Sequence, residues 1–586
     1  MIAPKLRLLK FLVIILAMNT ILVSCQSPGT NQGTNNPKDS VIKKQWWKEA
    51  VVYQIYPRSF KDANGDGIGD LKGIISKLDY IKSLGIDVVW INPIYSSPND
   101  DNGYDISDYR NIMKEFGTME DFDSLITGMH KRNIKLVMDL VVNHSSDEHE
   151  WFKQSRSSRT SPYRNYYHWR NAERGKPPYR YSLFDINHDA WRYDSQTNAY
   201  YLHYFSRKQP DLNWENPQVR KEVFDIMKFW ADKGIDGFRL DAFQFAAKDT
   251  TFPEFPKGFE KDFVKYYAIG PHLHDYLQEM NQEVLSKYDV MSVAEGAGNS
   301  FKDAHDLVDS NRKELNMAYA FDGVDIAKSG GYSLLHFKEV FTKWDSAFRD
   351  AGWLSIFLAN HDQARLVSRF GNDSPEFREL SSKMLTTFLM TMRGTPYYYN
   401  GDELGMTNPG FTKIEQYRDM PTLNEYQHLK TSGGDMKKFM KEIQFSCRDN
   451  GRTPFQWDSS VNAGFSAGTP WIEMNPNYKT INAEAQEKDS NSCLNYFRRI
   501  VRVRKDYPAL IYGRYTLLDK DNPNVYAYSR DNGSKKFIVL LNFTGKPATV
   551  NTGLDISKAT LTLGNYITPS KENTLRPYEA LVYEMK

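Results

Sequence analysis

Arg239 and Asp241 lie two residues apart in the segment GFRLDAF, and this pair could support nucleophilic or acid–base chemistry. Phe238, Leu240 and Ala242 alternate with them at the two-residue period of a β-strand, so the two polar side chains share one face. A nearby cation lowers the pKa of a carboxylate and keeps it ionised, which is the state a nucleophile needs. An isolated pair of this kind could instead be a structural salt bridge. The rest of the chain must decide between the two interpretations.

Three further candidate strands also end in polar side chains. These are Asp139, Asn143 and His144 of DLVVNH, Glu295 of VMSVAEG, and His361 and Asp362 of IFLANHD. In a (β/α)₈ barrel, every strand delivers the side chains at its carboxyl end to one shared mouth. The sequence therefore predicts a single site that four strands build together.

Three carboxylates, two histidines and an arginine fit the cleavage of a glycosidic bond. One carboxylate must be ionised to attack or stabilise an oxocarbenium-like centre, and another must be protonated to give the leaving oxygen its proton. Asp241 suits the first role, and Glu295 suits the second because it follows an apolar run that could raise its pKa. Asp362 is expected to help distort and hold the sugar ring. A metal site on the histidines is the competing interpretation, but neither H-x-x-x-H nor H-E-x-x-H occurs.

The elements that must position these residues form an α/β pattern from Trp46 onward. Eight β-type runs alternate with helical segments, at residues 51–56, 88–93, 135–143, 237–243, 290–295, 318–322, 354–360 and 396–399. This pattern predicts a (β/α)₈ TIM barrel in two parts, residues 46–144 and 217–506. An aromatic-rich insertion at 145–216 is too long for an ordinary loop and predicts a subdomain B over the barrel mouth. Short β-rich runs at 507–586 predict a C-terminal antiparallel β-sandwich.

The amino terminus has the features of an export signal. Basic residues precede an apolar run at 11–23, which is shorter than the about 20 residues that span a bilayer. The sequence Leu22-Val23-Ser24-Cys25 resembles a bacterial lipobox, which implies removal of residues 1–24 and a lipid anchor on Cys25. An ordinary signal peptide is the alternative. Residues 25–45 are polar and rich in Gly, Pro and Asn, as expected of a flexible tether. The sequence thus predicts an exported periplasmic or cell-envelope lipoprotein of a bacterium.

Composition limits the range of partners. Net charge is only +2 with 25% charged residues, so bulk charge does not favour nucleic acid or a membrane surface. We expect membrane contact only through the lipid anchor, and a monomer. Cys447 and Cys493 are the two remaining cysteines, and the sequence does not decide whether they pair.

The segment DANGDGIGD places oxygen atoms at alternate positions, with glycines at the tight points. The candidate ligands are the side chains of Asp62, Asn64, Asp66 and Asp70 and the carbonyl of Ile68. Alternating oxygen ligands of this kind could bind a hard cation. An Asx-rich turn without an ion is the alternative.

Several longer segments resemble the α-amylase superfamily, and specifically its oligo-1,6-glucosidase and α-glucosidase branch. They are WWKEAVVYQIYPRSF, QPDLNWENP, GPHLHDYLQEMN, NHDQ and RTPFQWD, and the similarity extends from Trp46 to nearly the end of the chain. The resemblance implies a retaining mechanism with Asp241 as nucleophile, Glu295 as general acid and then base, and Asp362 as stabiliser. It also implies a structural Ca²⁺ in the DANGDGIGD loop and no organic cofactor.

The same resemblance implies how a small α-glucan substrate is bound. The residues expected to contact the reacting sugar are His144, Arg239 and His361, with Asp105 of GYDISDY and Arg452 of GRTPFQWD at its non-reducing end. A pocket blocked at that end makes the branch exo-acting. We therefore expect release of terminal glucose from short isomalto- or malto-oligosaccharides.

Two positions bear on what the enzyme does with its substrate. In the resembled branch, valine after the nucleophile accompanies α-1,6 preference, whereas threonine or alanine accompanies tolerance of α-1,4 bonds. Ala242 therefore predicts that α-1,4 or mixed linkages are accepted. Sucrose isomerases carry an arginine-rich motif after the sixth strand, and AFDGVDIAKSGGYS has none, which favours hydrolysis. The alternatives are a transglycosylase or sucrose/trehalose-type isomerase, and a non-catalytic lipoprotein that binds starch oligosaccharides. A non-catalytic binding protein would be expected to lack at least one of the three carboxylates Asp241, Glu295 and Asp362.

Overall fold

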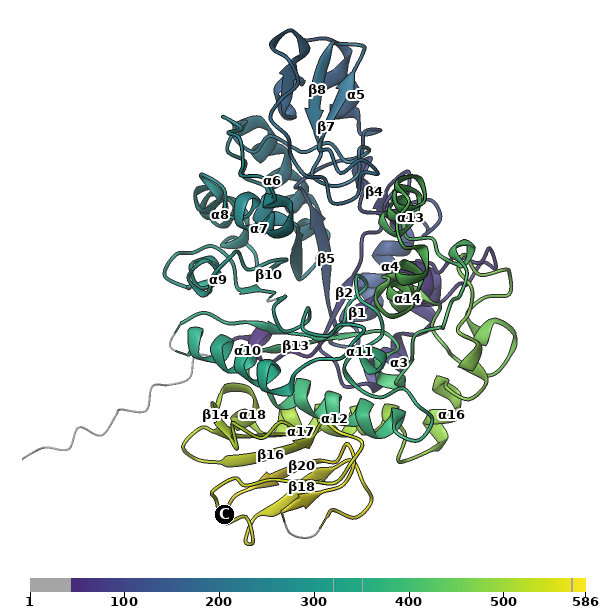
Figure 1. Ribbon diagram of the computed structural model, residues 1–586, viewed down its shortest axis with the longest axis vertical. Coiled ribbons are helices and arrows are strands. Elements are labelled where there is room, and N and C mark those ends of the chain that lie inside the picture. Colours follow the sequence, from purple (N-terminus) through teal and green to yellow (C-terminus); the bar gives the residue numbers. More distant parts are fainter. Residues whose placement is uncertain (1–43, 320, 350, 571–572) are drawn as a thin grey trace, which may run out of the picture. The chain divides into compact units, whose positions relative to one another are not determined.

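Eight parallel strands form the central sheet (Figure 1). They are β1 (Val52–Ile55), β2 (Val88–Ile91), β5 (Lys135–Val141), β9 (Gly237–Asp241), β10 (Met291–Ala294), β11 (Met317–Ala318), β12 (Ser355–Ile356) and β13 (Thr395–Tyr399). Their order is β11-β10-β9-β5-β2-β1-β13-β12. A parallel bridge between Ala318 and Leu354 joins the two ends, so the sheet closes into the predicted (β/α)₈ barrel.

The computed structural model describes residues 44–319, 321–349, 351–570 and 573–586. The predicted signal segment at 1–24 and nearly all of the tether at 25–45 lie outside these residues. Most of the observed strands end earlier than predicted: β9 stops at Asp241 and β12 at Ile356. Asn143, His144, Glu295, His361 and Asp362 follow the observed strands in the loops that build the barrel mouth, whereas Asp241 is the last residue of β9.

Helices cover the outside of the barrel. They include α2 (Leu71–Ser76), α3 (Leu78–Ser83), α4 (Met119–His130), α6 (Pro217–Asp232), α8 (Leu273–Met280), α9 (Phe301–Val308), α10 (Leu334–Ala347), α12 (Arg378–Thr391) and α17 (Cys493–Asp506). Helix α4 shows why they form: Thr118 and Asp121 make a capping box at its start, which satisfies amide groups that would otherwise lack partners. Its buried residues, Phe122, Leu125, Ile126 and Met129, recur at helical spacing and face the sheet. None of the helices in the described part of the chain has the length and apolar character needed to cross a membrane.

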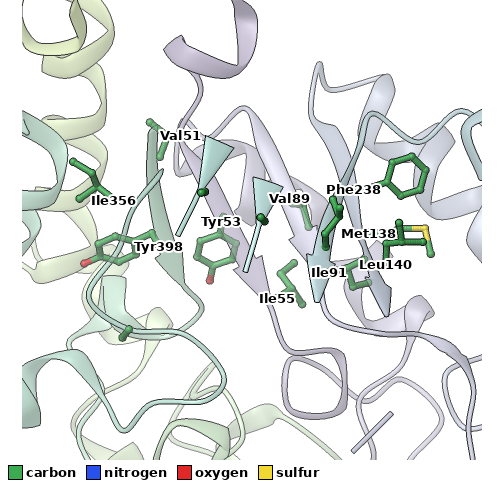
Figure 2. Packing of buried hydrophobic residues seen from close by; sticks show 14 of the residues in the cluster. Val51, Tyr53, Ile55, Val89, Ile91, Met138, Leu140, Phe238, Ile356 and Tyr398 are labelled. Carbon is green, nitrogen blue, oxygen red and sulfur yellow. The ribbon is translucent and has the colours of Figure 1, made fainter. Parts of the chain in front are cut away.

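Strand residues alternate between two hydrophobic layers, as the pleat requires. Figure 2 shows the layer that includes Val51, Tyr53, Val89, Met138 and Phe238. The intervening residues form a second cluster that contains Val52, Val88, Trp90, Val137 and Val293. Trp90 lies beside Arg239, with the guanidinium 5.1 Å from its ring centroid. The second cluster is therefore the barrel interior beneath the polar mouth.

The insertion between β5 and β9 contains a small antiparallel sheet. Its strands are β6 (Trp169–Asn171), β7 (Trp191–Asp194) and β8 (Ala199–Leu202), in the order β6-β8-β7, and α5 (Glu150–Ser157) precedes them. Phe152 of α5 stacks on Trp169, with ring centroids 5.7 Å apart. Phe152 belongs to the same hydrophobic cluster as the barrel residues, and Trp169 packs against that cluster, so the core of the insertion is continuous with that of the barrel.

The C-terminal region is an antiparallel sheet, as predicted. Strands β14 (Arg514–Leu518), β15 (Val525–Asp531), β16 (Lys536–Asn542), β20 (Ala580–Glu584) and β18 (Thr560–Gly564) form its five-stranded layer. The two-stranded pair β17 (Ala548–Thr549) and β19 (Thr574–Leu575) packs on it through Ala548 and Leu575, which share a cluster with Val525 and Leu540. Helix α18 (Pro508–Tyr512) precedes the first strand. Cys447 and Cys493 are both free thiols, and both are buried.

Candidate active site

Arg239 is the centre of the polar mouth of the barrel. This fully buried side chain lies in β9, where Arg239 pairs in register with Asp139 of β5 on one side and Val293 of β10 on the other. Its Nη1 atom donates to Asp139 Oδ1 at 2.9 Å and to Asp241 Oδ1 at 2.5 Å. Its Nη2 atom lies 2.5 Å from Glu295 Oε1. The sheet register thus brings three carboxylates onto one guanidinium.

The shared cation makes the ionisation of these acids interdependent. Burial and the neighbouring Glu295 carboxylate raise the pKa of Asp241 above its usual range, while Arg239 lowers it. The sequence had predicted a lowered pKa for Asp241 because it shows the arginine and not the depth of burial. Burial also raises the pKa of Asp139 to about 6. The pKa of Asp241 is therefore set by burial and by the neighbouring carboxylate as well as by the cation that it shares with Asp139 and Glu295.

Glu295 is oriented by the backbone as well as by the arginine. The N–H group of Ala242 donates to Glu295 Oε2 at 2.8 Å. Ala242 has a φ angle of +44°, in the left-handed region that residues other than glycine adopt infrequently. This turn directly after Asp241 is what points the amide at the second carboxylate.

Asp362 is the third carboxylate at the mouth. Its Oδ1 atom accepts from Arg448 Nη1 at 3.0 Å and from Arg452 Nη2 at 2.9 Å. Burial alone would raise the pKa of Asp362, but the His361 ring and the two guanidinium groups outweigh it, so the pKa lies below its ordinary value. Asp362 is therefore ionised throughout the neutral range.

Both histidines at the mouth are neutral near pH 7. Burial lowers the pKa of His144 to about 3 and that of His361 well below its ordinary value. Asn143 Nδ2 donates to His144 Nδ1 at 3.1 Å, and Gln54 Nε2 lies 2.8 Å from His361 Nδ1. The Gln54 amide assigns the proton of His361 to Nε2, and the carbonyl of Tyr104, 3.1 Å from His144 Nε2, assigns that of His144 to the same atom. Each ring is thus a neutral hydrogen-bond donor that does not compete with the carboxyl groups for a proton.

Asp241, Glu295 and Asp362 line one small cavity of about 80 Å³. Its lining residues are Asp101, Tyr104, His144, Phe184, Phe205, Asp241, Ala242, Glu295, Asp362 and Arg448. An ion pair between Asp101 Oδ1 and Arg448 Nη2, at 3.1 Å, forms part of its wall. A second cavity of about 740 Å³ shares Phe205, Ala242 and Glu295 with it. We call the first the catalytic pocket and the second the acceptor cavity, since Glu295 lies at their junction.

Comparison with known proteins agrees with this geometry. The family model for the α-amylase catalytic domain matches residues 54–513. The chain belongs to the α-amylase family. It is therefore a glycoside hydrolase.

Among its relatives, an oligo-1,6-glucosidase of Parageobacillus thermoglucosidasius is 51% identical over 93% of this chain and 100% of the relative. A trehalose-6-phosphate hydrolase of Bacillus subtilis is 45% identical over 92% of this chain and 98% of the relative. The crystal structure of an isomaltulose synthase from Klebsiella sp. LX3 matches with a TM-score of 0.90 and 44% identity, covering 93% of this chain and 100% of that one. The family fold is thus shared by enzymes named for different reactions.

The structure corrects one residue predicted for the non-reducing end of the sugar. Asp105 is fully buried and does not line the catalytic pocket. Its carboxylate accepts from Ser97 Oγ at 2.9 Å and from the backbone N–H groups of Asp100 and Asp101, at 3.0 and 3.1 Å. Asp105 therefore holds the loop that presents Asp101, and Asp101 is the carboxylate that faces the pocket.

The structure also places the predicted arginine, Arg452, outside the lining of the catalytic pocket. Arg452 Nε donates to the carbonyl of His361 at 2.8 Å, and its Nη2 contacts Asp362, but Arg452 does not line the pocket. Arg448 lines it instead, between α14 (Met436–Ser446) and α15 (Asp449–Arg452), and binds Asp101, Asp362 and Asp419. The sequence held a signal for each residue: Asp101 lies in the acidic run PNDDNGYD, and Arg448 is the first arginine of RDNGR. Spacing alone did not show which aspartate or which arginine of each segment lines the pocket.

The remaining predicted site residues lie in the loop at 62–70. Asp62 accepts from the N–H groups of Gly65 and Gly67 at 2.7 and 2.8 Å, and Asp70 accepts from that of Ala63 at 3.0 Å. Asn64 and Asp66 make Asx-type bonds to the N–H groups two residues on. In the described part of the chain, no group of three or more Asp, Glu, His or Cys residues is arranged to hold a metal ion. A cation here would depend on mixed oxygen ligands, including the Ile68 carbonyl.

Proposed function

We propose that this enzyme is a retaining, exo-acting α-glucosidase that hydrolyses terminal α-linked glucose from short isomalto- or malto-oligosaccharides. The observation that carries this proposal is the placement of Asp241 and Glu295 on the two nitrogens of one guanidinium, at the edge of a small cavity. Carboxylates close together on either side of a scissile bond characterise retaining glycosidases. The oligo-1,6-glucosidase relatives support the substrate class.

The proposed reaction has two displacements. Ionised Asp241 attacks the anomeric carbon and forms a glycosyl ester, while Glu295 gives its proton to the glycosidic oxygen of the leaving sugar. Glu295, now a carboxylate, then takes a proton from a water molecule whose oxygen attacks the same carbon and releases Asp241. The Ala242 amide and Arg239 hold Glu295 in place through both steps. Ionised Asp362 stabilises the positive charge that develops on the sugar ring in each transition state.

The wall of the pocket supports the exo-acting mode. Asp101 and Arg448 form an ion pair at 3.1 Å, and both line the catalytic pocket together with the three carboxylates. A carboxylate and a guanidinium can accept and donate hydrogen bonds to the hydroxyl groups of a terminal sugar. We propose that these two residues, with Asp362 and His144, bind the non-reducing glucose.

A sucrose isomerase or transglycosylase is the second candidate, because the similar solved structures include isomaltulose synthases. Such an enzyme would share the glycosyl ester at Asp241 and differ only in what attacks it. The absence of an arginine-rich motif after the sixth strand favours water as the attacking group.

A panel of glucose disaccharides tests the proposal. The purified protein is expected to release glucose from isomaltose or maltose, with α-glucose appearing first in ¹H NMR spectra because two inversions retain the anomeric configuration. Initial release of β-glucose would overturn the mechanism. Conversion of sucrose mainly to an isomer would favour the second candidate, and absence of turnover would leave a binding protein.

We further propose that the loop at 62–70 binds a structural Ca²⁺. Its donors are all oxygen atoms, which suits a hard cation. Asp62 and Asp70 are near enough for the Asp62 charge to act on Asp70, and both carboxylates interact with the backbone N–H of Asn64. Two adjacent carboxylates repel each other, and a divalent cation would relieve that repulsion.

We also propose that the protein is exported, anchored in the cell envelope through a lipid on Cys25, and monomeric. The lipobox-like sequence and the polar tether after it support export and the lipid anchor. Labelling with radioactive palmitate, compared between the natural protein and Cys25→Ser, tests the anchor; equal labelling would contradict it.

A further inference from the structure

We infer that the acceptor cavity selects neutral or cationic leaving groups and excludes anionic ones, such as sugar phosphates. This inference rests on the proposed α-glucosidase function and specifies its substrate class. It concerns the cavity of about 740 Å³ that joins the catalytic pocket at Glu295. The leaving group must occupy this side because Glu295 protonates the oxygen that departs with it.

The charges that line the acceptor cavity all have one sign. The acidic lining residues other than the proton donor Glu295 are Asp262, Asp322 and Asp325, and the described residues of the lining contain no lysine, arginine or histidine. A cavity lined by charges of one sign repels ligands of that sign and attracts the opposite one. The local field therefore opposes a phosphate or carboxylate group on the leaving sugar.

Two cations near Asp325 lie outside the lining of the cavity. Lys328 and Arg369 are close enough to influence Asp325, but neither lines the cavity. Arg369 is buried, and it donates to the backbone carbonyls of Val324 and Leu358. Its guanidinium is thus engaged by the protein rather than presented to a ligand.

The other lining residues suit an uncharged sugar. Aromatic side chains such as Phe263, Phe301 and Trp344 line the cavity, and flat apolar rings can contact sugar faces. Trp344 Nε1 donates to Asp322 Oδ2 at 3.1 Å, which orients that carboxylate. Carboxylate and amide oxygens accept hydrogen bonds from hydroxyl groups, and Gln244 supplies an amide on this wall. The cavity therefore combines surfaces for a neutral sugar with repulsion of anions.

A charge series of substrates tests the inference. Three aryl α-glucosides that differ only in a para substituent on the leaving phenol are compared: aminomethyl (cationic), carboxamide (neutral) and carboxylate (anionic). We expect kcat/KM for the carboxylate to be at least about tenfold below that for the carboxamide at low salt, and the gap to narrow at high salt because added ions screen the repulsion. Trehalose 6-phosphate is likewise expected to be a much poorer substrate than trehalose.

The double variant Asp322→Asn/Asp325→Asn identifies the residues responsible. The ratio of kcat/KM for the anionic to the neutral glucoside should rise by about tenfold, and it should lose most of its salt dependence. Asparagine keeps an oxygen that can accept from Trp344, so the substitution removes charge with little change in shape. Asp555→Asn is the matched control, since Asp555 is exposed in the C-terminal sheet region, and its ratio should equal that of the natural enzyme.

The outcomes separate this inference from the proposed function. If the neutral glucoside is hydrolysed and the anionic one is hydrolysed equally well, charge selection is wrong while the α-glucosidase proposal stands. If the ratio does not change in the double variant, Asp322 and Asp325 are not the selecting residues and the inference is overturned. If no glucoside is hydrolysed, the proposed function itself fails.

Discussion

Asp101 offers a direct test of the geometry of the site, because the structure places Asp101, and not the predicted Asp105, in the wall of the catalytic pocket. We predict that Asp101→Asn lowers kcat/KM for a glucose disaccharide by about 100-fold. The carboxylate lines the catalytic pocket and pairs with Arg448 at 3.1 Å. A hydrogen bond to a charged group contributes about 1.5–3 kcal/mol, and the upper value corresponds to about 100-fold at about 1.4 kcal/mol per tenfold.

The same substitution should change how the stability of the fold depends on pH. Burial raises the pKa of Asp101 from 3.8 to about 6, with Arg448 and Arg452 acting in the opposite direction. A carboxyl group whose folded pKa is raised stabilises the fold below its unfolded pKa and loses that contribution as pH rises through the folded value. A rise of about two pKa units means that ionised Asp101 costs about 3 kcal/mol of unfolding free energy at pH 7. Asp101→Asn removes this pH dependence, so its stability relative to the natural enzyme should increase between pH 4 and pH 7, in addition to any constant cost of taking this partner from Arg448.

Two measurements check this prediction: steady-state kinetics on isomaltose and maltose, and urea denaturation at pH 4 and pH 7. Asp105→Asn is the comparison, since Asp105 accepts three hydrogen bonds inside the protein. We expect that variant to lose stability by about 1–3 kcal/mol at pH 4, the cost of disrupting buried hydrogen bonds. The loss should be smaller at pH 7, because burial raises the pKa of Asp105 to about 7. If Asp101→Asn kept more than a third of the natural kcat/KM, the assignment of the pocket wall would be refuted. The same would follow if Asp101→Asn unfolded more readily at pH 7 than at pH 4 relative to the natural enzyme.

Three further predictions follow from other parts of the structure. Asp241→Asn should nearly abolish hydrolysis with folding retained, because an amide cannot form the glycosyl ester. The rate of hydrolysis is measured by steady-state kinetics, and circular dichroism checks that the variant is folded. An unchanged rate would contradict the proposed mechanism. Ala242→Val should lower the unfolding free energy by about 1–3 kcal/mol, because a β-branched residue is strained at positive φ. It should also reduce activity on maltose more than activity on isomaltose. If the ratio of variant to natural activity were the same on both disaccharides, the linkage inference would be contradicted. Removal of Ca²⁺ with a chelator should lower the thermal unfolding midpoint, and added Ca²⁺ at about 100 times its dissociation constant should restore about 2.7 kcal/mol of unfolding free energy. The stability of Asp66→Ala should no longer respond to the chelator or to Ca²⁺. A natural enzyme whose midpoint is unchanged by both treatments would contradict the loop site.

The barrel could be predicted because its signal is local and repeated. Each strand is a short apolar run, and polar residues follow directly after several of them, as in LVVNH and FLANHD. The positions of Asp241, Glu295 and Asp362 at one mouth followed from topology alone, since parallel strands of a closed barrel end at the same face. The shared guanidinium of Arg239 then required only the register of β9 between β5 and β10.

The pocket wall could not be predicted in the same way because it is formed by loops. Asp101 and Asp105 are four residues apart, as are Arg448 and Arg452, and all four side chains are largely buried with charged or polar partners. Which member of each pair faces the pocket depends on turns that carry no hydrophobic period. Sequence similarity indicated the correct segments and the wrong residues within them.

The sequence by itself predicted the barrel and three carboxylates after or at the ends of its strands, because periodic apolar runs and their polar ends encode these features locally. Only the tertiary structure decided how those acids share charge and which loop residues enclose the sugar. Burial depth sets the pKa of Asp241 against the pull of Arg239, and burial depends on the packing of elements far apart in the chain. The same long-range packing brings Arg448 to Asp101 across more than three hundred positions, a contact that no local pattern specifies.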